Sequence, residues 1–141
     1  MNRPSLPCLC ANLRRAARAL TQRYDEALRP LGITITQFTI LQALSLAGKV
    51  TQGRLGEVLA MDSTTLTRTL AIMGKRGWIS SEPGADRRER RLSLSGAGKL
   101  MFNRVLPHWQ RTQLELGTRF GQERWNNLMN AINDVTSAVT Q

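Results

Sequence analysis

The sequence predicts a mainly α-helical protein with a small β hairpin. Three observations predict this class. Apolar residues recur at three- and four-residue spacing over most of the 141 positions, which is typical of amphipathic helices. Residues 78–94 instead read as two short strands around a turn that contains Pro83 and Gly84. The chain is also long enough for one domain with its own core.

The charge of the chain narrows the class of partner. Lys and Arg total 20 against 10 Asp and Glu, which gives a net charge of +10 and a pI near 11.4. A protein this basic favours a polyanion, and nucleic acid is the commonest one. A membrane surface would require one basic amphipathic helix, whereas this charge spreads over several segments, and no apolar run reaches a membrane span. Because Arg14 and Arg15 closely follow Cys10, the N-terminus lacks a signal-peptide core, and we expect a cytoplasmic protein.

Residues 1–33 should form an irregular arm and a first helix. We expect the helix from Cys10 to about Arg29, with Pro30 near its end. Its apolar stripe consists of Leu13, Ala17, Leu20, Tyr24, Ala27 and Leu31. A stripe of this length needs a packing partner.

Two further helices and a short strand should follow. Thr34 and Gln37 fit a capping box that opens a helix through Leu46. Val50 can add a short strand to the hairpin, and the next helix should cover residues 51–60.

The helix expected from Thr64 to Arg76 has two chemically different faces. The apolar face carries Leu66, Leu70 and Met73. The opposite face carries Thr64, Arg68, Ala71 and Lys75. Short hydroxyls can approach base edges and Arg can fork onto guanine, while Asp62 or Ser63 suits the N-cap. Considered alone, this face could equally be an ordinary solvated one.

The hairpin after this helix is basic at its tip. Residues 78–79 should start one strand and residues 91–94 should form the other. The tip carries Arg87, Arg88 and Arg90, and a narrow minor groove attracts inserted arginines. We expect Asp86 and Glu89 to be internal partners that hold the arginines in position.

Helix, turn, helix and basic hairpin together predict a winged helix-turn-helix over residues 34–95 that docks on double-stranded DNA. A charge run is more often a soluble loop, but a basic hairpin directly after a helix-turn-helix favours contact with DNA. The residues expected to contact DNA are Ser63, Thr64, Thr65, Thr67, Arg68, Lys75, Arg87, Arg88 and Arg90.

Residues 96–141 should form two more helices. Ser95 can cap a long helix through about Gly117, which Pro107 should bend or divide. The last helix, residues 122–139, has a heptad-like seam of Trp125, Leu128, Ile132, Val135 and Val139. A small winged domain cannot cover both terminal stripes, so we expect N- and C-terminal dimerisation helices and a homodimer. An intramolecular helical pair is the alternative.

The order of motifs resembles the MarR family of bacterial transcription regulators. The resemblance rests on Leu55-Gly56, residues 61–68, residues 75–79, residues 86–91 with the Asp-x-Arg signature of the wing, and residues 94–98. It covers nearly the whole chain, which is then a single MarR-like domain. It implies a homodimeric regulator, for which we expect a repressor, that binds a pseudo-palindromic operator and is released by a small-molecule effector or an oxidant.

Cys8 and Cys10 are the chemically distinctive residues outside the DNA motif. Cys10 should lie at the start of the first helix, where free N–H groups favour a reactive thiolate, and Arg14 adds positive charge. Spacings from Cys10 resemble the organic hydroperoxide-sensing branch of the family, which implies that Tyr24 contacts the thiol. Arg14 departs from that branch, because it stands where a second tyrosine is expected. Redox sensing and two incidental thiols both remain open.

Other functions have less support from the sequence. A thiol peroxidase-like enzyme using Cys10 would need a base or an oxyanion site, and neither is recognisable. A nonspecific architectural DNA binder would not need the ordered helix and wing pattern. His108 is the single histidine and lies far in sequence from both cysteines, so it makes a poor set of metal ligands, and no cofactor motif occurs. We therefore expect neither an enzyme nor a cofactor.

Overall fold

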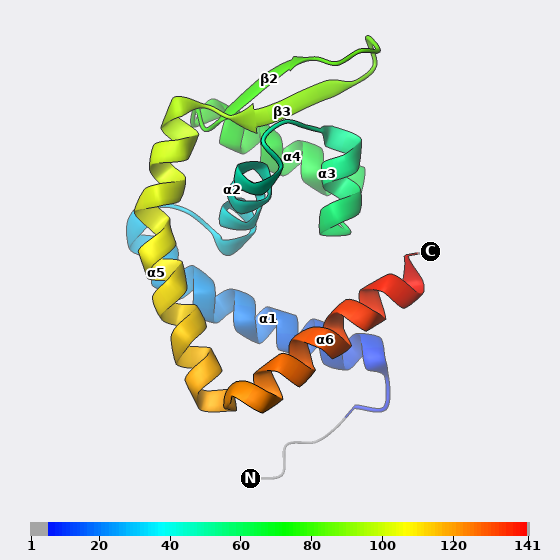
Figure 1. The fold of residues 1–141 in the computed structure, drawn as a ribbon, viewed down its shortest axis with the longest axis vertical. Coiled ribbons are helices and arrows are strands. Elements are labelled where there is room, and N and C mark those ends of the chain that lie inside the picture. The colour runs from blue at the N-terminus through cyan, green and yellow to red at the C-terminus, as the bar shows by residue number, and fades with distance from the viewer. Residues whose placement is uncertain (1–5, 141) are drawn as a thin grey trace.

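The computed structural model describes residues 6–140 and is mainly helical with one small antiparallel sheet, which confirms the predicted class (Figure 1). The sheet and helices α2, α3 and α4 lie at one end of the molecule, and α1 and α6 lie at the other, with α5 between them. The elements are α1 (Leu9–Leu28), η1 (Arg29–Leu31), α2 (Ile35–Ala47), β1 (Val50–Thr51), α3 (Gln52–Leu59), α4 (Ser63–Lys75), β2 (Ile79–Pro83), β3 (Arg90–Leu94), α5 (Gly96–Phe120) and α6 (Gln122–Val139).

The sheet has the strand order β1-β3-β2. β2 and β3 form the hairpin, whose register pairs Ile79 with Leu94 and Pro83 with Arg90. β1 adds to the other side of β3 by pairing Val50 with Leu92, which confirms the short strand expected at Val50. The hairpin is therefore anchored on both sides at its base and free at its tip.

The core centres on α2. Phe38 of α2 is fully buried. Its ring stacks on Phe102 of α5, with 5.5 Å between ring centroids, and lies 5.7 Å from the ring of Trp109, so α2 packs directly against α5. The buried apolar residues are Leu28, Ile33, Phe38, Ile40, Leu41, Leu44, Leu55, Leu66, Met73, Trp78, Leu92, Met101 and Val105. Every helix of the winged unit contributes to this cluster, which fixes the helices relative to the sheet.

Side-chain caps start the helices of this unit, as the sequence indicates. The capping box of α2 is complete, since the Thr34 hydroxyl accepts from the Gln37 N–H at 3.2 Å and the Gln37 side chain accepts from the Thr34 N–H at 3.1 Å. Ser95 caps α5 by accepting from the Gly98 N–H at 3.0 Å. These bonds satisfy N–H groups that have no partner within a helix.

Two helix boundaries differ from the expected ones. α5 continues through Pro107 to Phe120 and is drawn as one curved helix in Figure 1, so the proline does not divide it. Buried Val105 and Thr112 hold the helix against the body on either side of the exposed proline. α1 ends one residue early, because Arg29 and Pro30 enter a 3-10 turn that closes at Gly32.

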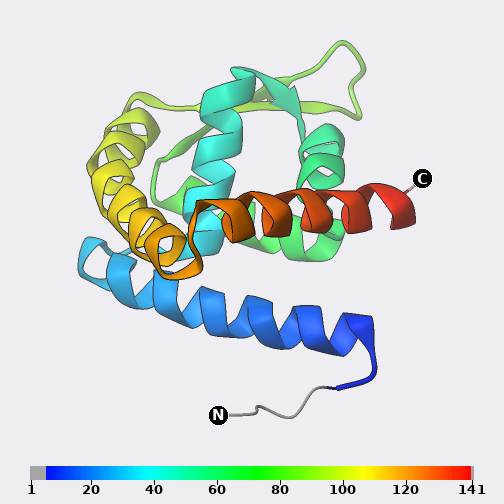
Figure 2. The same ribbon diagram turned by 60° about the horizontal axis from the view of Figure 1, so that its bottom comes forward.

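α6 contacts α5 but is not buried. It contributes no buried side chain within the described part of the chain, and Ile132 and Val139 of the predicted seam are 38% and 75% exposed. Figure 1 shows α6 and α1 as long rods at the end of the molecule away from the sheet, and Figure 2 turns that end toward the viewer. Within residues 6–140 no single helix is long and apolar enough to cross a membrane; only α1 and α2 taken together, across an 81° bend, pass that test of length and composition.

Gly98 is required where α5 meets the start of β2. A Cβ at this position would lie 2.0 Å from the Trp78 carbonyl oxygen, whereas a Cβ at Gly96 would meet nothing within 4 Å. We expect Gly98→Ala to lower the free energy of unfolding by at least about 2 kcal/mol, because backbone must move, and Gly96→Ala to change it by less than about 1 kcal/mol. Urea denaturation of both variants measures the difference, and equal effects would contradict the close approach.

Candidate DNA interface

α4 buries one face and exposes the other. Leu66 and Met73 are buried and Leu70 is partly buried, as the periodicity predicts. The outer face is hollowed into one shallow depression lined by Ser63, Thr64, Thr67, Arg68 and Ala71. The structure therefore gathers four of the predicted DNA contacts, three hydroxyls and one guanidinium, on a single exposed surface.

The N-terminal end of α4 is held by Asp62. Its Oδ2 accepts from the Thr65 N–H at 3.1 Å, which resolves the choice of N-cap between Asp62 and Ser63. The hydrogen bond from Thr65 holds the pKa of Asp62 below its ordinary value. The carboxylate therefore stays charged at neutral pH, and its contribution is lost only as the pH falls through the lowered pKa. The first turn of α4, which carries the hydroxyls, keeps a fixed start.

A link between α3 and α4 was not foreseen from the sequence. The Gln52 side-chain amide donates to the Thr67 hydroxyl at 3.0 Å, across the turn of the helix-turn-helix. The two residues are 15 apart in sequence, so no local pattern points to the bond. The bond orients the Thr67 hydroxyl in the α4 depression. Because this hydroxyl accepts from Gln52, its own proton is free to donate to a partner outside.

The tip of the hairpin is a tight turn. The Gly84 N–H donates to the Glu89 carbonyl at 2.9 Å, and the Glu89 N–H donates to the Asp86 carbonyl at 3.0 Å. A Cβ at Gly84 would lie 2.9 Å from the Glu89 Cβ, so glycine permits this approach. The Asp86 carboxylate accepts from the Arg88 N–H at 3.2 Å. Asp86 is thus an internal partner of Arg88, as expected, but through the backbone of the turn. Among residues 6–140 neither Asp86 nor Glu89 forms an ion pair with an arginine.

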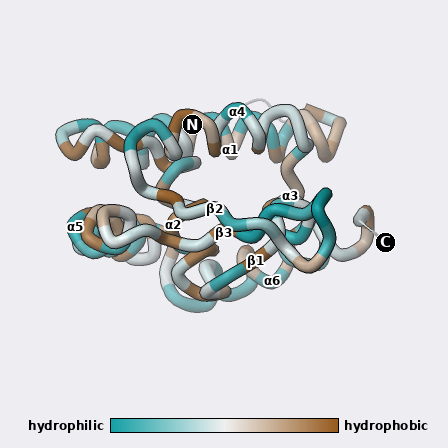
Figure 3. The backbone as a smooth tube through the Cα atoms, turned by 90° about the horizontal axis from the view of Figure 1, so that it is seen from above, coloured by the Kyte–Doolittle hydropathy of each residue, from teal (hydrophilic) through white to brown (hydrophobic). Residues whose placement is uncertain are grey.

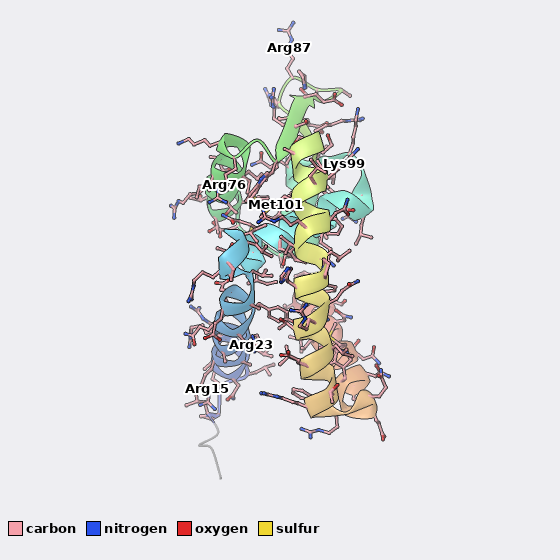
Figure 4. All side chains as sticks on the ribbon, turned by 90° about the vertical axis from the view of Figure 1, so that its left-hand side faces the viewer. Arg15, Arg23, Arg76, Arg87, Lys99 and Met101 are labelled. Atoms are coloured by element: carbon pink, nitrogen blue, oxygen red, sulfur yellow. The ribbon has the colours of Figure 1, made fainter. Side chains whose placement is uncertain are left out.

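The three wing arginines differ in freedom. Arg87 and Arg88 are exposed at the tip, and Figure 4 shows the Arg87 side chain extending beyond it. Arg90 is held at the start of β3, where its Nε donates to the Ser81 hydroxyl of β2 at 3.0 Å. Figure 3 looks down on the hairpin and colours most of its outer part hydrophilic. The tip can therefore adapt to a partner, while Arg90 presents a fixed cation.

Two of the DNA contacts predicted on α4 lie outside the depression. Lys75 is the exposed last residue of α4, several turns from Thr64, and Thr65 is exposed but does not line the depression. Both stay on the helix surface, so they flank the gathered side chains rather than join them.

Cys8 and Cys10 lie at the start of α1, and both are exposed. Cys8 is the N-cap with extended backbone angles (φ −90°, ψ 122°), whereas Cys10 is already helical. The Asn12 side-chain amide donates to the Cys8 carbonyl at 2.9 Å and also to the Leu6 carbonyl, a contact that the sequence did not suggest. The segment before α1 is thereby folded back onto the first helical turn.

Tyr24 lies near the other end of the same helix. Fourteen residues separate it from Cys10, which is about 21 Å along an α-helix. Its hydroxyl donates to Gln113 of α5, and burial raises the pKa of Tyr24. A contact between Tyr24 and a reactive thiol therefore requires Cys10 of a second subunit. No group of three or more His, Cys, Asp or Glu side chains in the described range could hold a metal ion.

Comparison with known proteins identifies this arrangement. Residues 33–89 match the model of the MarR family. The chain is 37% identical to the M. tuberculosis transcriptional regulator MosR, whose structure in complex with DNA superposes with a TM-score of 0.85 over 93% of this chain and 95% of that one. The chain belongs to the MarR family. It is a MarR-family transcription regulator with a winged helix-turn-helix.

Other relatives of this MarR-family chain agree. The organic hydroperoxide resistance transcriptional regulator of Bacillus subtilis is 34% identical over 99 residues, which are 70% of this chain and 67% of the relative. A mutant MarR from E. coli in complex with operator DNA is 25% identical, with a TM-score of 0.80 over 90% of this chain and 92% of that one. The first of these relatives is a transcription regulator, and the second was solved bound to operator DNA. The family match at residues 33–89 includes the α4 depression and the wing tip and stops just before Arg90.

Proposed function

We propose that this MarR-family chain is a repressor that binds a pseudo-palindromic operator as a homodimer. The observation that carries the proposal is the outer face of α4, where three hydroxyls and Arg68 share one shallow depression beside a hairpin with a basic tip. A depression of small side chains lets the helix approach base edges closely. The solved complexes of MosR with DNA and of E. coli MarR with operator DNA, both structural neighbours of this chain, support DNA binding.

Each part of the surface contributes in a different way. α4 lies in the major groove, where Arg68 pairs bidentately with guanine and the hydroxyls of Ser63, Thr64 and Thr67 contact base edges or phosphates. Lys75, further along the helix, meets phosphate. The exposed wing arginines enter the adjacent minor groove, where negative potential concentrates. An architectural binder would bind all sequences equally, which gives no reason for the ordered hydroxyls on α4.

Arg68 should carry more of the specificity than Lys75. Selection from random DNA supplies the operator, and binding of Arg68→Ala and Lys75→Ala to the operator and to a random duplex is then compared. We expect Arg68→Ala to lose about 1–3 kcal/mol of discrimination, because a bidentate contact to guanine is lost. Lys75→Ala should weaken both duplexes alike. If Arg68→Ala also weakens binding to both duplexes alike, α4 does not read bases through Arg68. If selection with the wild type enriches no sequence, the architectural binder is favoured.

The homodimer follows from the terminal helices. The seam of α6 is left partly exposed by its own chain, with Trp125, Leu128 and Val135 only partly buried and Ile132 and Val139 exposed. Apolar stripes of this kind mark an interface, and a two-fold dimer would present two α4 helices to two half-sites. Packing of α6 on α5 within one chain, the alternative to a dimer, leaves most of this apolar stripe exposed.

A charge on the seam should prevent dimerisation. We expect Ile132→Asp to give a monomer or an unfolded chain, because the carboxylate would be buried without a partner. Asn130→Asp adds the same charge on the opposite face of α6 and should leave the dimer intact. Sedimentation velocity at micromolar concentration separates these results. A wild-type protein that is a folded monomer under those conditions would refute the dimer.

Release of DNA is proposed to follow oxidation of Cys8 and Cys10. The Cys10 thiolate attacks an organic hydroperoxide, the O–O bond breaks, and an alcohol leaves with formation of a sulfenic acid. The Cys8 thiol then attacks that sulfur, the S–S bond forms, and water leaves. Extended backbone at Cys8 supports a bond within the pair, because on a regular helix residues two apart point about 200° from each other. Closure strains the first turn of α1, which shifts the dimer frame and the spacing of the two α4 helices.

A small ligand is the other route to release. A hollow between α2, β3 and α5 is lined by apolar Leu44 and Phe102 and by the cations Lys49 and Lys99. The apolar wall suits an aromatic ring and Lys99 suits a carboxylate, whereas Lys49 is already paired with Glu82 at 3.0 Å. A small aromatic acid therefore fits this position between the winged unit and the frame. In this case the cysteines take no part in release.

Serine variants distinguish the two routes. We expect Cys10→Ser to keep operator binding and to lose the response to organic hydroperoxide, because the attacking thiolate is gone. Cys8→Ser should accumulate the sulfenic acid or a disulfide between subunits instead of the bond within the pair. Fluorescence anisotropy of labelled operator with mass spectrometry of the oxidised protein follows both changes. A double serine variant that responds like the wild type would make the cysteines incidental, and multiple turnover of the peroxide would indicate a thiol peroxidase.

A further inference from the structure

Arg76 connects the end of the recognition helix α4 to a distant part of the chain. It is the C-cap of α4, and its guanidinium donates to the carbonyl of Gly32, 44 residues earlier in the sequence. The same guanidinium lies over the ring of Trp78, 4.9 Å from the ring centre. In Figure 4, Arg76 lies at the end of α4 above the C-terminal end of α1.

The carbonyl that Arg76 binds belongs to a rigid junction between α1 and α2. Leu28 before it and Ile33 after it are buried in the core. The Asp25 carboxylate of α1 accepts from the Ile35 N–H at 2.7 Å, which ties the two helices across the turn. Gly32 itself has a left-handed φ of +73°, a backbone conformation that residues with a side chain rarely adopt. The acceptor therefore has a fixed position relative to the core.

The aromatic ring on the other side of Arg76 is fixed as well. Trp78 is 7% exposed, and its backbone carbonyl accepts from the Ser95 N–H at 3.1 Å at the base of the wing. A planar guanidinium can stack on a ring while its N–H groups donate at the edge, which an ammonium cannot do. Arg76 is thus held between the α1–α2 junction and the base of the wing.

We propose that Arg76 is a positioning residue for DNA recognition, one that sets the angle of α4 without touching DNA. The proposal rests on the proposed function, since it requires α4 to read bases. Arg68 and Thr64 must meet base edges with correct alignment, and a small tilt of the helix spoils directional contacts more than contacts with phosphate. Loss of Arg76 therefore lowers affinity for the operator and spares affinity for random DNA.

A direct contact between Arg76 and phosphate is the competing explanation, because Arg76 is exposed. The neighbouring Lys75 provides a matched control. It carries the same charge in the same turn, and within the described residues its side chain forms no hydrogen bond or ion pair. Lys75→Met and Arg76→Met each remove one positive charge and retain a long apolar stem.

The experiment measures binding of the full chain to the operator and to a random duplex of equal length over a series of salt concentrations. We expect Arg76→Met to weaken operator binding roughly tenfold, as is typical for loss of one coupling interaction, with an unchanged dependence on salt. Lys75→Met should weaken both duplexes equally and reduce the slope of log affinity against log salt by about 0.9. Thermal melting of each variant verifies that it is folded.

If Arg76→Met is unstable, Arg76→Lys replaces it in the experiment, because lysine keeps the positive charge. It cannot stack and donate to Gly32 at once, so we expect it to lose operator affinity as Arg76→Met does. Full operator affinity in Arg76→Lys would overturn the proposal, because charge alone would then suffice. Equal weakening of both duplexes by Arg76→Met with a reduced salt slope would overturn it in favour of a phosphate contact. If the proposed function is wrong, the result is different, because the wild type itself then binds the operator and the random duplex with equal affinity.

Discussion

The approach of α5 to the backbone of Trp78 is the constraint on which the winged unit depends. Glycine at position 98 allows the helix to lie against the Trp78 carbonyl oxygen, which any side chain there would displace. The same carbonyl accepts from the Ser95 N–H, and the Ser95 hydroxyl donates to the Gly77 carbonyl while capping α5. The end of α4, both strands of the wing and the start of α5 therefore meet at one point. A change in any one of them is transmitted to the others through backbone rather than through flexible side chains.

This junction explains how one small unit can present two different surfaces. α4 is packed onto the core through Leu66 and Met73, so the backbone that carries its hydroxyls and Arg68 has a fixed position. The wing is anchored only at its base, and Arg87 and Arg88 at its tip keep their conformational freedom. A fixed surface suits directional contacts with base edges, while a mobile cation suits the less directional field of a groove. The division of labour follows from where each element is attached to the core.

The sequence predicted what depends on local periodicity and left out what depends on distant contacts. The two faces of α4, its cap and the glycine turn of the wing are short-range patterns, and the structure has each of them. The bonds from Gln52 to Thr67 and from Arg76 to Gly32 join residues 15 and 44 apart, so no spacing rule reveals them. Pro107 illustrates the same limit, because the cost of a proline in a helix is local, whereas the packing that outweighs it is not.

The role of Asp86 shows a related limit at the site itself. The sequence indicated that it holds the arginines in position, and its carboxylate does so through the backbone N–H of Arg88 rather than through a guanidinium. A short side chain just before a tight turn is better placed to accept from nearby backbone than to reach a guanidinium. Contact residues were therefore predictable from charge, whereas the way in which Asp86 holds them was not.

The two ends of α1 constrain how an event at the cysteines could reach α4. Cys8 and Cys10 lie at the free start of the helix, while Leu28 at its other end is fully buried and Gly32 beyond it is bound by Arg76. The helix has 20 residues and is about 30 Å long, so it acts as a rod that is fixed at one end. Strain at the start of such a rod displaces the free end most and the fixed end least. Under the proposed oxidation, the movement is therefore expressed first in the packing between subunits, and the angle of α4 within each subunit is preserved. DNA would be released because the two recognition helices change their spacing, not because either one loses its shape.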